Sequence, residues 1–227
     1  MTQGVDPDRI ETVRLVVYDG FRRTGRAPSL FGIAAAAEIG PDEVPEALAA
    51  LHLSRDVVLR DGAIAMAHPF TSVPLGFSVM GSSVLWWGGC AWDSFAIPHL
   101  IPEERTVLVA TTCPGCGAAL AWVVDDRRPP DGAEVGHFLT PVQRMWDDVV
   151  HSCGHQRLFC SVDCVDRWLE RTGRERGYVM DLDTLWTLAR DWYRGRLERG
   201  YRRREPLEAA EYFRSVGLHG PFWGLPD

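Results

Sequence analysis

The sequence predicts an α+β fold in two parts, a helical N-terminal module followed by a mixed α/β domain. Three observations predict it. Apolar residues recur every three or four positions in three segments before residue 54, and two short apolar runs then flank an Asp61-Gly62 turn. Beyond residue 104, strand-like runs alternate with cysteine pairs. With 227 residues, of which 46% are hydrophobic, the chain is long enough to bury a sizeable core.

The first 75 residues are predicted to form a winged-helix-like module. Residues 8–24, 28–40 and 41–53 each show the spacing of an amphipathic helix with start or stop signals at the ends. The Asp61-Gly62 pair between two apolar runs is typical of a tight β-hairpin, which would form the wing. The sequence therefore predicts a domain boundary after residue 75.

Nucleic acid is not an expected partner. The chain carries a formal net charge of −7, and it contains Arg but no Lys. A third helix that reads DNA needs basic side chains, whereas this one carries Asp42, Glu43 and Glu46 and no Arg. The acidic helix favours a packing or dimerisation role for the module.

The sequence predicts a cytoplasmic protein without a membrane segment. The stretch MTQGVDPDRIETV is polar and lacks the apolar core of a signal peptide. No run of about 18 apolar residues occurs, so no membrane span is expected. In the cytoplasm, six cysteines indicate metal or redox chemistry before they indicate disulfides.

The second part, residues 76–227, is predicted to mix helices and strands. A Pro-, Gly- and Ser-rich stretch at 69–86 would link the two parts and carry one short strand. The further elements are expected in the following order: a helix at about 90–100, strands at 105–112, 118–126 and 137–141, a short helix or irregular stretch at 142–150, a strand and a helix within 151–173, and an amphipathic helix at 181–201.

Four of the six cysteines have the spacing of a structural zinc site. Cys113 and Cys116 lie in CPGC, on a tight turn after a strand, while Cys160 and Cys164 lie at a strand end and in a first helical turn. Together they supply the four thiolates that a tetrahedral Zn²⁺ site needs. We expect a structural Zn²⁺ and no organic cofactor. A redox motif or plain buried thiols are the alternatives.

Cys90 and Cys153 remain once the set of four is complete. Cys90 lies three positions before Asp93 in GGCAWDSFAIPHLI, so a helix would place both side chains on one face. A leftover cysteine is usually a small buried hydrophobic residue, whereas burying an unpaired carboxylate is costly. The residues alone leave open whether these side chains form a site or pack in the core.

Two segments resemble the catalytic segments of alkylmercury (organomercurial) lyases. CAWDSFAIPHLI is similar to the first, a Cys-Ala-x-Asp on a helix followed by an apolar stretch with a Pro, and SCGHQRLFCS is similar to the second. The matching positions are Cys90, Asp93 and Cys153, and Cys113 matches a family cysteine regarded as structural. The similarity covers roughly residues 8–200. In addition, CPGC and FCSVDC resemble zinc fingers of the TRASH type, which implies a treble-clef-like zinc core.

The resemblance implies an enzyme that cleaves carbon–mercury bonds by protonolysis. Cys90 and Cys153 would bind mercury, a soft cation that prefers thiolates, and Asp93 would pass a proton to the departing carbon. The products would be a hydrocarbon and Hg(II), which cellular thiols or a reductase would take over. An apolar shell would receive the substrate and raise the pKa of Asp93. The candidate pocket residues, for which core packing is the alternative, are Trp86, Trp87, Trp92 and Phe95.

Two other functions stay open. The chain could be a non-catalytic zinc-finger protein that binds or senses a soft metal, or a related enzyme that cleaves another carbon–heteroatom bond. The sequence departs from the lyase pattern at Gly89, near which the family usually has an aromatic residue, and at Leu158-Phe159, in place of an aromatic pair. These departures bear on the identity of the substrate more than on the fold.

Overall fold

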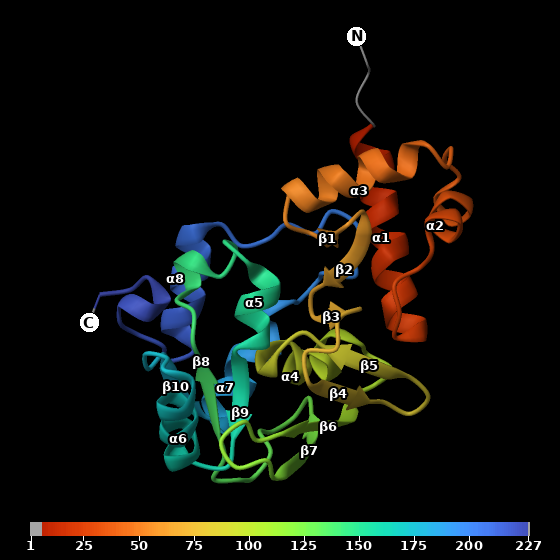
Figure 1. Cartoon of the computed structure of the whole chain (residues 1–227). Coiled ribbons are helices and arrows are strands. Elements are labelled where there is room, and N and C mark those ends of the chain that lie inside the picture. The colour runs from red at the N-terminus through yellow and green to blue at the C-terminus, as the bar shows by residue number, and fades with distance from the viewer. Residues whose placement is uncertain (1–5, 227) are drawn as a thin grey trace.

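The computed structural model describes residues 6–226, so residues 1–5, with which the predicted module and the polar N-terminal stretch begin, lie outside the described residues. Figure 1 shows the first three helices at one end of the molecule and the later helices and strands at the other. The α-helices are α1 (Pro7–Thr24), α2 (Leu30–Ala37), α3 (Glu43–Leu53), α4 (Ala91–Leu100), α5 (Val149–Gly154), α6 (Val162–Thr172), α7 (Leu182–Trp192) and α8 (Pro206–Ser215).

The three N-terminal helices form where the sequence predicts them. The Asp6 side chain accepts the N–H of Asp8 at the start of α1, and Gly25 ends this helix in a left-handed conformation. The Ser29 side chain caps α2 in the same way by accepting the N–H of Gly32. The predicted hairpin is also confirmed, because β1 (Val58–Arg60) pairs antiparallel with β2 (Ala63–Ala67).

One sheet of seven strands runs through both predicted parts of the chain. Its order is β1-β2-β3-β5-β4-β6-β7, and every described pair is antiparallel. The remaining strands of this sheet are β3 (Phe70–Thr71), β4 (Phe77–Met80), β5 (Leu85–Gly88), β6 (Thr106–Thr112) and β7 (Ala119–Asp125). The domain boundary after residue 75 and the winged-helix description stay predictions, and the hairpin shares a sheet with the strands beyond that boundary.

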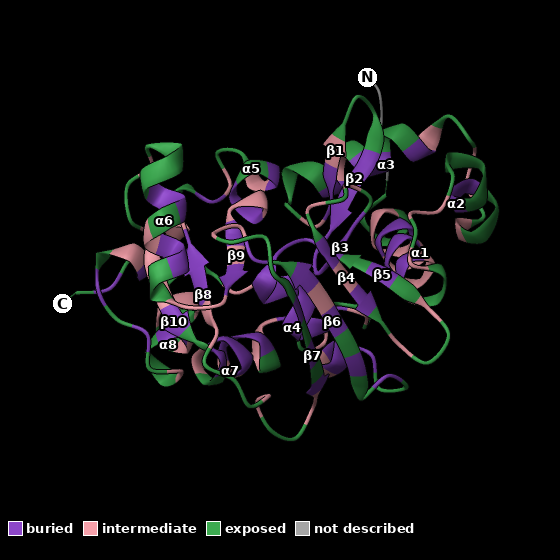
Figure 2. Cartoon of the chain, turned by 60° about the horizontal axis from the view of Figure 1, so that its bottom comes forward, coloured by how far each residue is buried: buried purple, intermediate pink, exposed green. Residues whose placement is uncertain are grey.

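A second, three-stranded sheet lies beside the first, with α4 between them. Its order is β10-β8-β9, formed by β8 (Val135–Phe138), β9 (Gln156–Phe159) and β10 (Tyr178–Asp181). Helix α4 packs against α7 and against strands of both sheets, and all of its residues except His99 are buried (Figures 1 and 2). A helix that is apolar on all sides is expected at such a position in the core.

Two segments differ from their predictions. The stretch 69–86 contains three strands rather than one, because Phe70, Phe77 and Val79 bury their side chains and the intervening Pro and Gly residues form turns. The amphipathic helix expected over 181–201 ends at Trp192, and Gly195 and Gly200 beyond it have positive φ angles. The chain then continues through an irregular segment to α8, a helix that the sequence analysis missed.

Aromatic side chains pack the segment after α7 against the core. The Trp92 ring of α4 lies 4.7 Å from that of Trp192 and 6.2 Å from that of Phe213 in α8. The Trp223 ring also packs on Trp92, at 6.3 Å. Such contacts add to the free energy gained from burying the rings. Residues after 192 therefore close one side of the region around α4.

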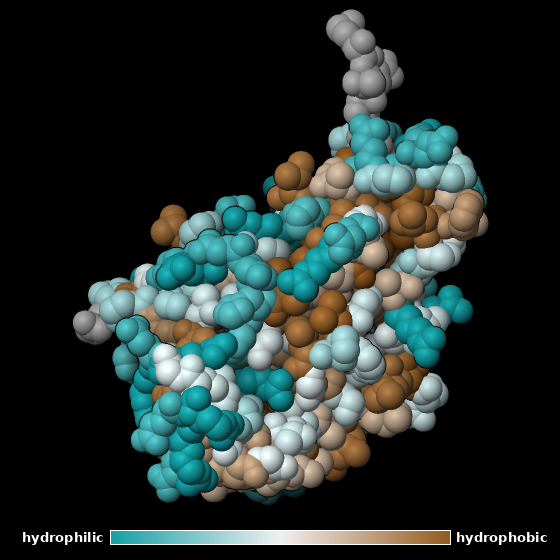
Figure 3. All heavy atoms as spheres, in the orientation of Figure 1, coloured by the Kyte–Doolittle hydropathy of each residue, from teal (hydrophilic) through white to brown (hydrophobic). Residues whose placement is uncertain are grey.

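The surface is mixed in character. On the face shown in Figure 3, apolar side chains reach the surface near the middle, and hydrophilic residues flank them. Within residues 6–226, no helix is both long and apolar enough to cross a bilayer.

Candidate active site

The first part of the site is the N-terminus of α4. Cys90 is the N-cap residue of this helix, and its Sγ accepts the backbone N–H of Asp93 at 3.3 Å. Asp93 lies in the first turn, and both side chains are buried, with exposed fractions of 2% and 1%. The spacing of three residues therefore places a cap thiol and a carboxylate at the positive end of the helix dipole.

Glycine before the cap makes room for this carboxylate. A Cβ on Gly89 would lie 2.2 Å from Oδ2 of Asp93, and one on Gly88 would lie 2.0 Å from Oγ of Ser94. Real side chains do not approach so closely, so the carboxylate could not hold this position beside a larger residue. The departure from the family pattern at Gly89 thus has a local structural reason.

Asp93 is held from two further elements. Tyr193, directly after α7, donates its hydroxyl hydrogen to Oδ1 at 2.5 Å. Cys153 in α5 donates its thiol hydrogen to Oδ2 at 3.9 Å. The two oxygens of the carboxylate therefore have separate partners, and Oδ2 is the one that faces the Cys153 thiol.

His68 completes the surroundings of Cys153. This residue lies in the turn between β2 and β3, and its Nε2 is 3.5 Å from Sγ of Cys153. Three possible ligand atoms lie within 4.8 Å of one another: a ring nitrogen of His68, a carboxylate oxygen of Asp93 and the sulfur of Cys153. All three residues are buried. The sequence analysis missed His68 and Tyr193, because neither belongs to a local motif and only the fold brings them to the cysteines.

Burial shifts the pKa values of the site residues strongly. It raises the pKa of Asp93 to about 6, against hydrogen bonds from Tyr193 and Cys90 that lower it. It also raises the pKa of Cys90, and a hydrogen bond with Cys153 and the charge of Asp93 add to this increase. A hydrogen bond with Cys90 lowers the pKa of Cys153, but burial and the Asp93 carboxylate together raise it further than that. Burial thus keeps protons on the two thiols and brings the pKa of Asp93 closer to neutral pH.

The same burial acts on His68 in the opposite sense. Desolvation, helped by the charges of Arg196 and Arg203, lowers the pKa of His68 to about 3. The imidazole beside Cys153 is therefore neutral.

The cluster opens into a large cavity of about 1040 Å³. Cys90, Asp93 and Cys153 all line it, together with His68 and Trp92. Such a volume accommodates a small organic ligand.

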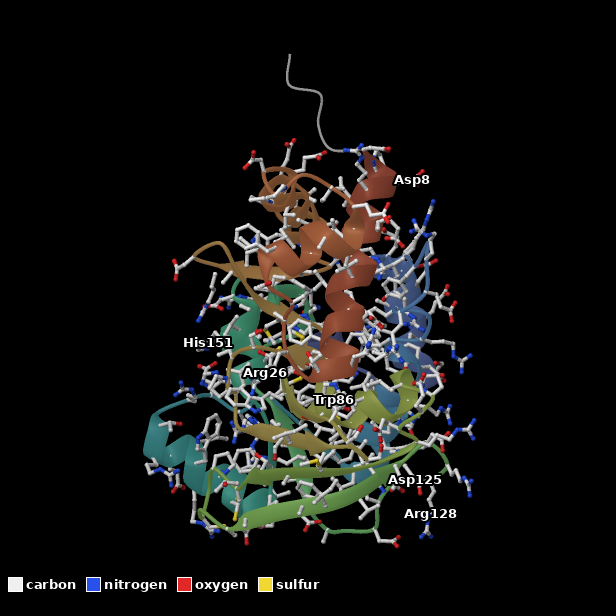
Figure 4. The ribbon with its side chains drawn as sticks, turned by 90° about the vertical axis from the view of Figure 1, so that its right-hand side faces the viewer. Asp8, Arg26, Trp86, Asp125, Arg128 and His151 are labelled. Atoms are coloured by element: carbon white, nitrogen blue, oxygen red, sulfur yellow. The ribbon has the colours of Figure 1, made fainter. Side chains whose placement is uncertain are left out.

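Of the four aromatic residues predicted to line a substrate pocket, only Trp92 lines this cavity among the described residues. Trp86 is buried below the C-terminal end of α1, where its indole N–H donates to the carbonyl of Phe21 (Figure 4). Trp87 is 38% exposed. The Phe95 ring packs on that of Trp122 at 6.1 Å. Trp86 and Phe95 therefore pack in the core, Trp87 is partly exposed, and none of the three lines the cavity.

The other four cysteines form a separate cluster. The sulfurs of Cys113, Cys116, Cys160 and Cys164 lie within 4.8 Å of one another, with Cys116 and Cys160 at 3.6 Å. Burial raises the pKa of the Cys113 thiol, but backbone N–H groups of Cys160, Cys116 and Gly115 lower it to about 7. These four residues could hold a metal ion.

His155, two residues after Cys153, takes no part in either cluster. Its Nδ1 contacts the carbonyl oxygen of His151 at 2.7 Å, and its Nε2 contacts a guanidinium nitrogen of Arg174 at 2.9 Å. These contacts indicate a structural role for His155.

A comparison with protein-family models identifies the chain. The model described as alkylmercury lyase (MerB) matches residues 70–194, more than half of the sequence. The chain belongs to the alkylmercury lyase family. As a member of it, the protein is a carbon–mercury lyase, and its substrates are organomercurials.

The fold agrees with this assignment to the lyase family. A solved structure described as the mercury-bound form of MerB2 superposes with a TM-score of 0.63 at 14% sequence identity, over 85% of this chain and 93% of that one. A comparison with curated protein sequences gives no match. The family match includes Cys90, Asp93 and Cys153 but not His68, and it ends two residues before Arg196.

Proposed function

We propose that the lyase cleaves carbon–mercury bonds by protonolysis, with Cys90 and Cys153 as mercury ligands and Asp93 as the proton carrier. The observation that carries the proposal is the arrangement around buried Asp93. The Cys153 thiol donates to its carboxylate, the Cys90 sulfur accepts its backbone N–H, and all three residues line one cavity. Thiolates are preferred ligands of soft metal ions, and two of them bound to one mercury weaken its bond to carbon.

The first step is an exchange of thiols. One site thiol displaces the thiol that carries the organomercurial, and the displaced carrier leaves with the proton. The second site thiol then binds mercury, and its proton passes to the Asp93 carboxylate. For Cys153 this transfer follows the existing hydrogen bond to Oδ2.

The second step breaks the carbon–mercury bond. Protonated Asp93 donates its proton to the carbon, the electron pair of the carbon–mercury bond forms the new carbon–hydrogen bond, and mercury stays bound to two sulfurs as Hg(II). A carboxyl group with a pKa of about 6 can both accept and donate this proton near neutral pH. Tyr193 keeps Oδ1 occupied, so Oδ2 is the oxygen left to carry the proton.

We assign a structural Zn²⁺ to the second cysteine cluster. Four ligands at about 2.3 Å in a tetrahedron place sulfurs about 3.8 Å apart. The 3.6 Å contact between Cys116 and Cys160 and the 4.8 Å limit for the whole set are close to this geometry. Zn²⁺ there would join the turn after β6 to the start of α6, as a treble-clef-like core requires. Cytoplasmic location and transfer of Hg(II) to a reductase or cellular thiols stay predictions.

Hydrocarbon release tests the proposed roles. Purified protein, phenylmercury and excess thiol should give benzene in the headspace, and Asp93→Asn should lower the rate at least about 100-fold while the protein still takes up mercury. Asp183→Asn, a change at an exposed position of α7, is the matched control. Benzene release by Asp93→Asn at the wild-type rate would remove Asp93 from the mechanism. If the protein only binds soft metals and has no lyase activity, neither wild type nor Asp93→Asn would release benzene.

A further inference from the structure

The wall of the active-site cavity contains a buried guanidinium that the mechanism does not use. Arg196 is 4% exposed and lines the cavity together with the two thiols. Its Nε donates to the hydroxyl of Tyr18 at 2.7 Å, and its guanidinium lies over the rings of Tyr18, Tyr193 and Tyr201, with centroids 5.2–5.5 Å away. Within the part of the chain that the structure describes, Nη2 has no hydrogen-bond partner.

This charge also lacks a counter-ion. Among residues 6–226, no carboxylate oxygen lies within 4.0 Å of an Arg196 nitrogen. The nearby Asp93 has other partners, since Tyr193 and Cys153 occupy its two oxygens. A buried charge without a partner is costly, so its persistence in the wall of a ligand cavity points to an anion that arrives with the ligand.

Further arginines line the same cavity. Arg203 donates to the carbonyl of Ser54, and its guanidinium lies 5.1 Å from the ring centroid of Trp146, which contacts His68 edge-on at 5.6 Å. The complete set of cavity arginines is Arg55, Arg196, Arg202, Arg203 and Arg204. The chain as a whole carries a net charge of −7, so the clustering of these arginines makes the cavity unusually positive for this protein and favours anionic ligands.

Within residues 6–226, the acidic residues of the cavity form no ion pair within 4.0 Å with these arginines. Asp56 accepts the hydroxyl hydrogen of Ser54, and Glu205 caps the N-terminus of α8. Arg204 differs from the other arginines, because both of its terminal nitrogens already donate, to the carbonyls of Trp192 and Asp191. Among the described residues, Arg196 and Arg203 are therefore the cavity arginines that are at least partly buried and have a terminal nitrogen without a hydrogen-bond partner.

We propose that Arg196 and Arg203 form a carboxylate-binding subsite, so that the lyase favours organomercurials that enter the cavity with a carboxylate. The inference rests on the proposed function, since the mercury end of the ligand goes to Cys90 and Cys153. The carboxylate is carried either by the organic group or by the thiol that delivers mercury. Guanidinium groups bind carboxylates through paired, charge-assisted hydrogen bonds, which supply both affinity and orientation.

Two pairs of matched compounds distinguish a carboxylate on the organic group from a carboxylate on the carrier thiol. The first pair is 4-mercuribenzoate and phenylmercury, both with excess 2-mercaptoethanol. The second is phenylmercury delivered by 3-mercaptopropionate or by 2-mercaptoethanol. The readouts are kcat/KM for hydrocarbon release and the mercury that Asp93→Asn protein retains on dialysis against neutral thiol. The variants are Arg203→Gln and Arg196→Gln, with Arg214→Gln, at an exposed position of α8 outside the cavity, as control.

We expect wild type and Arg214→Gln to prefer the carboxylate member of at least one pair, and Arg203→Gln to lower that preference about tenfold. If Arg203→Gln loses the preference in the first pair, the subsite binds a carboxylate on the organic group. If it loses the preference in the second pair, the subsite binds a carboxylate on the carrier thiol. Should Arg196→Gln fail to fold by circular dichroism, Arg203→Gln alone decides. Equal preference in wild type and Arg203→Gln for both pairs overturns the subsite. Charge-dependent retention without hydrocarbon release would support the subsite and contradict the proposed catalysis.

Discussion

The hydroxyl of Tyr193 donates a 2.5 Å hydrogen bond to Oδ1 of Asp93, and this contact joins the end of α7 to the start of α4. The two residues are 100 positions apart, and both are buried. The bond fixes the orientation of the carboxylate, so that its second oxygen faces Cys153. Tyr193 is therefore a positioning residue for the proton carrier.

Removing this hydroxyl should slow the chemical step. In Tyr193→Phe, Asp93 loses the partner of Oδ1 and can turn away from Cys153, so we expect kcat to fall about tenfold with little change in the amount of mercurial bound. Steady-state kinetics with benzene detection and mercury retention measure the two effects. Tyr178→Phe, a change in β10 outside the cavity, should leave both at wild-type values. Parallel loss of binding and turnover in Tyr193→Phe would indicate a general structural role instead.

A methyl group at residue 89 should impair the site without unfolding the protein. The Cβ of Gly89→Ala would lie 2.2 Å from Oδ2 of Asp93, so the carboxylate must move and hydrocarbon release should fall at least tenfold. Gly136→Ala is the control, since its Cβ would meet neighbours only at 3.4–3.8 Å. Wild-type activity in Gly89→Ala would show that the observed position of Asp93 is not needed for catalysis.

Substitutions in the two groups of cysteines should have different effects on the zinc content. We expect about one Zn per chain in protein that has not been exposed to mercury, and Cys116→Ser should lose the metal and lower the melting temperature, because the remaining thiolates cannot complete a tetrahedron. Cys90→Ser should keep its zinc and lose hydrocarbon release. Zinc absent from the wild type, or lost from Cys90→Ser instead of Cys116→Ser, would contradict the assignment.

Stability should depend on pH through His137. Burial lowers the pKa of this histidine from 6.5 to about 4, and its Nε2 accepts the N–H of Gly177 at 3.1 Å, which requires the neutral ring. The unfolded chain therefore takes up a proton first as the pH falls, and up to about 3 kcal/mol of stability is lost between pH 6.5 and 4.

Denaturant unfolding at several pH values measures this contribution. His137→Gln can keep the acceptor for Gly177 without titrating, so the decline in the free energy of unfolding below pH 6.5 should become shallower. His219→Gln, at an exposed position near the C-terminus, should retain the wild-type slope. An unchanged slope in His137→Gln would remove this histidine from the acid sensitivity.

The sequence predicted those features that depend on residues close together in the chain. The helical spacing of Cys90 and Asp93 and the turn chemistry of CPGC are local signals, and the structure contains both the helix and the cysteine cluster. His68 and Tyr193 reach the site through contacts 85 and 100 residues apart, for which a single sequence carries no signal. The length of the last predicted helix was wrong because charged residues continue the helical pattern past Trp192, although Gly195 interrupts the helix.

Strand formation between residues 69 and 86 was underestimated for a related reason. The Pro and Gly residues there predict turns, but pairing with β6 and packing beneath α1 stabilise short strands between those turns. The aromatic residues near Cys90 show a similar limit. They were candidate pocket residues with core packing as the alternative. Trp92 lines the cavity, Trp86 and Phe95 pack in the core, and Trp87 is partly exposed, while residues of the C-terminal segment form a further part of the cavity wall.

The most direct test locates the mercury. Crystals of the protein treated with phenylmercury should show, by anomalous scattering, one mercury atom bonded to the sulfurs of both Cys90 and Cys153, with Asp93 beside it and no mercury among Cys113, Cys116, Cys160 and Cys164. Mercury bound to only one of the two sulfurs after hydrocarbon release, or bound only at the four-cysteine cluster, would contradict the account.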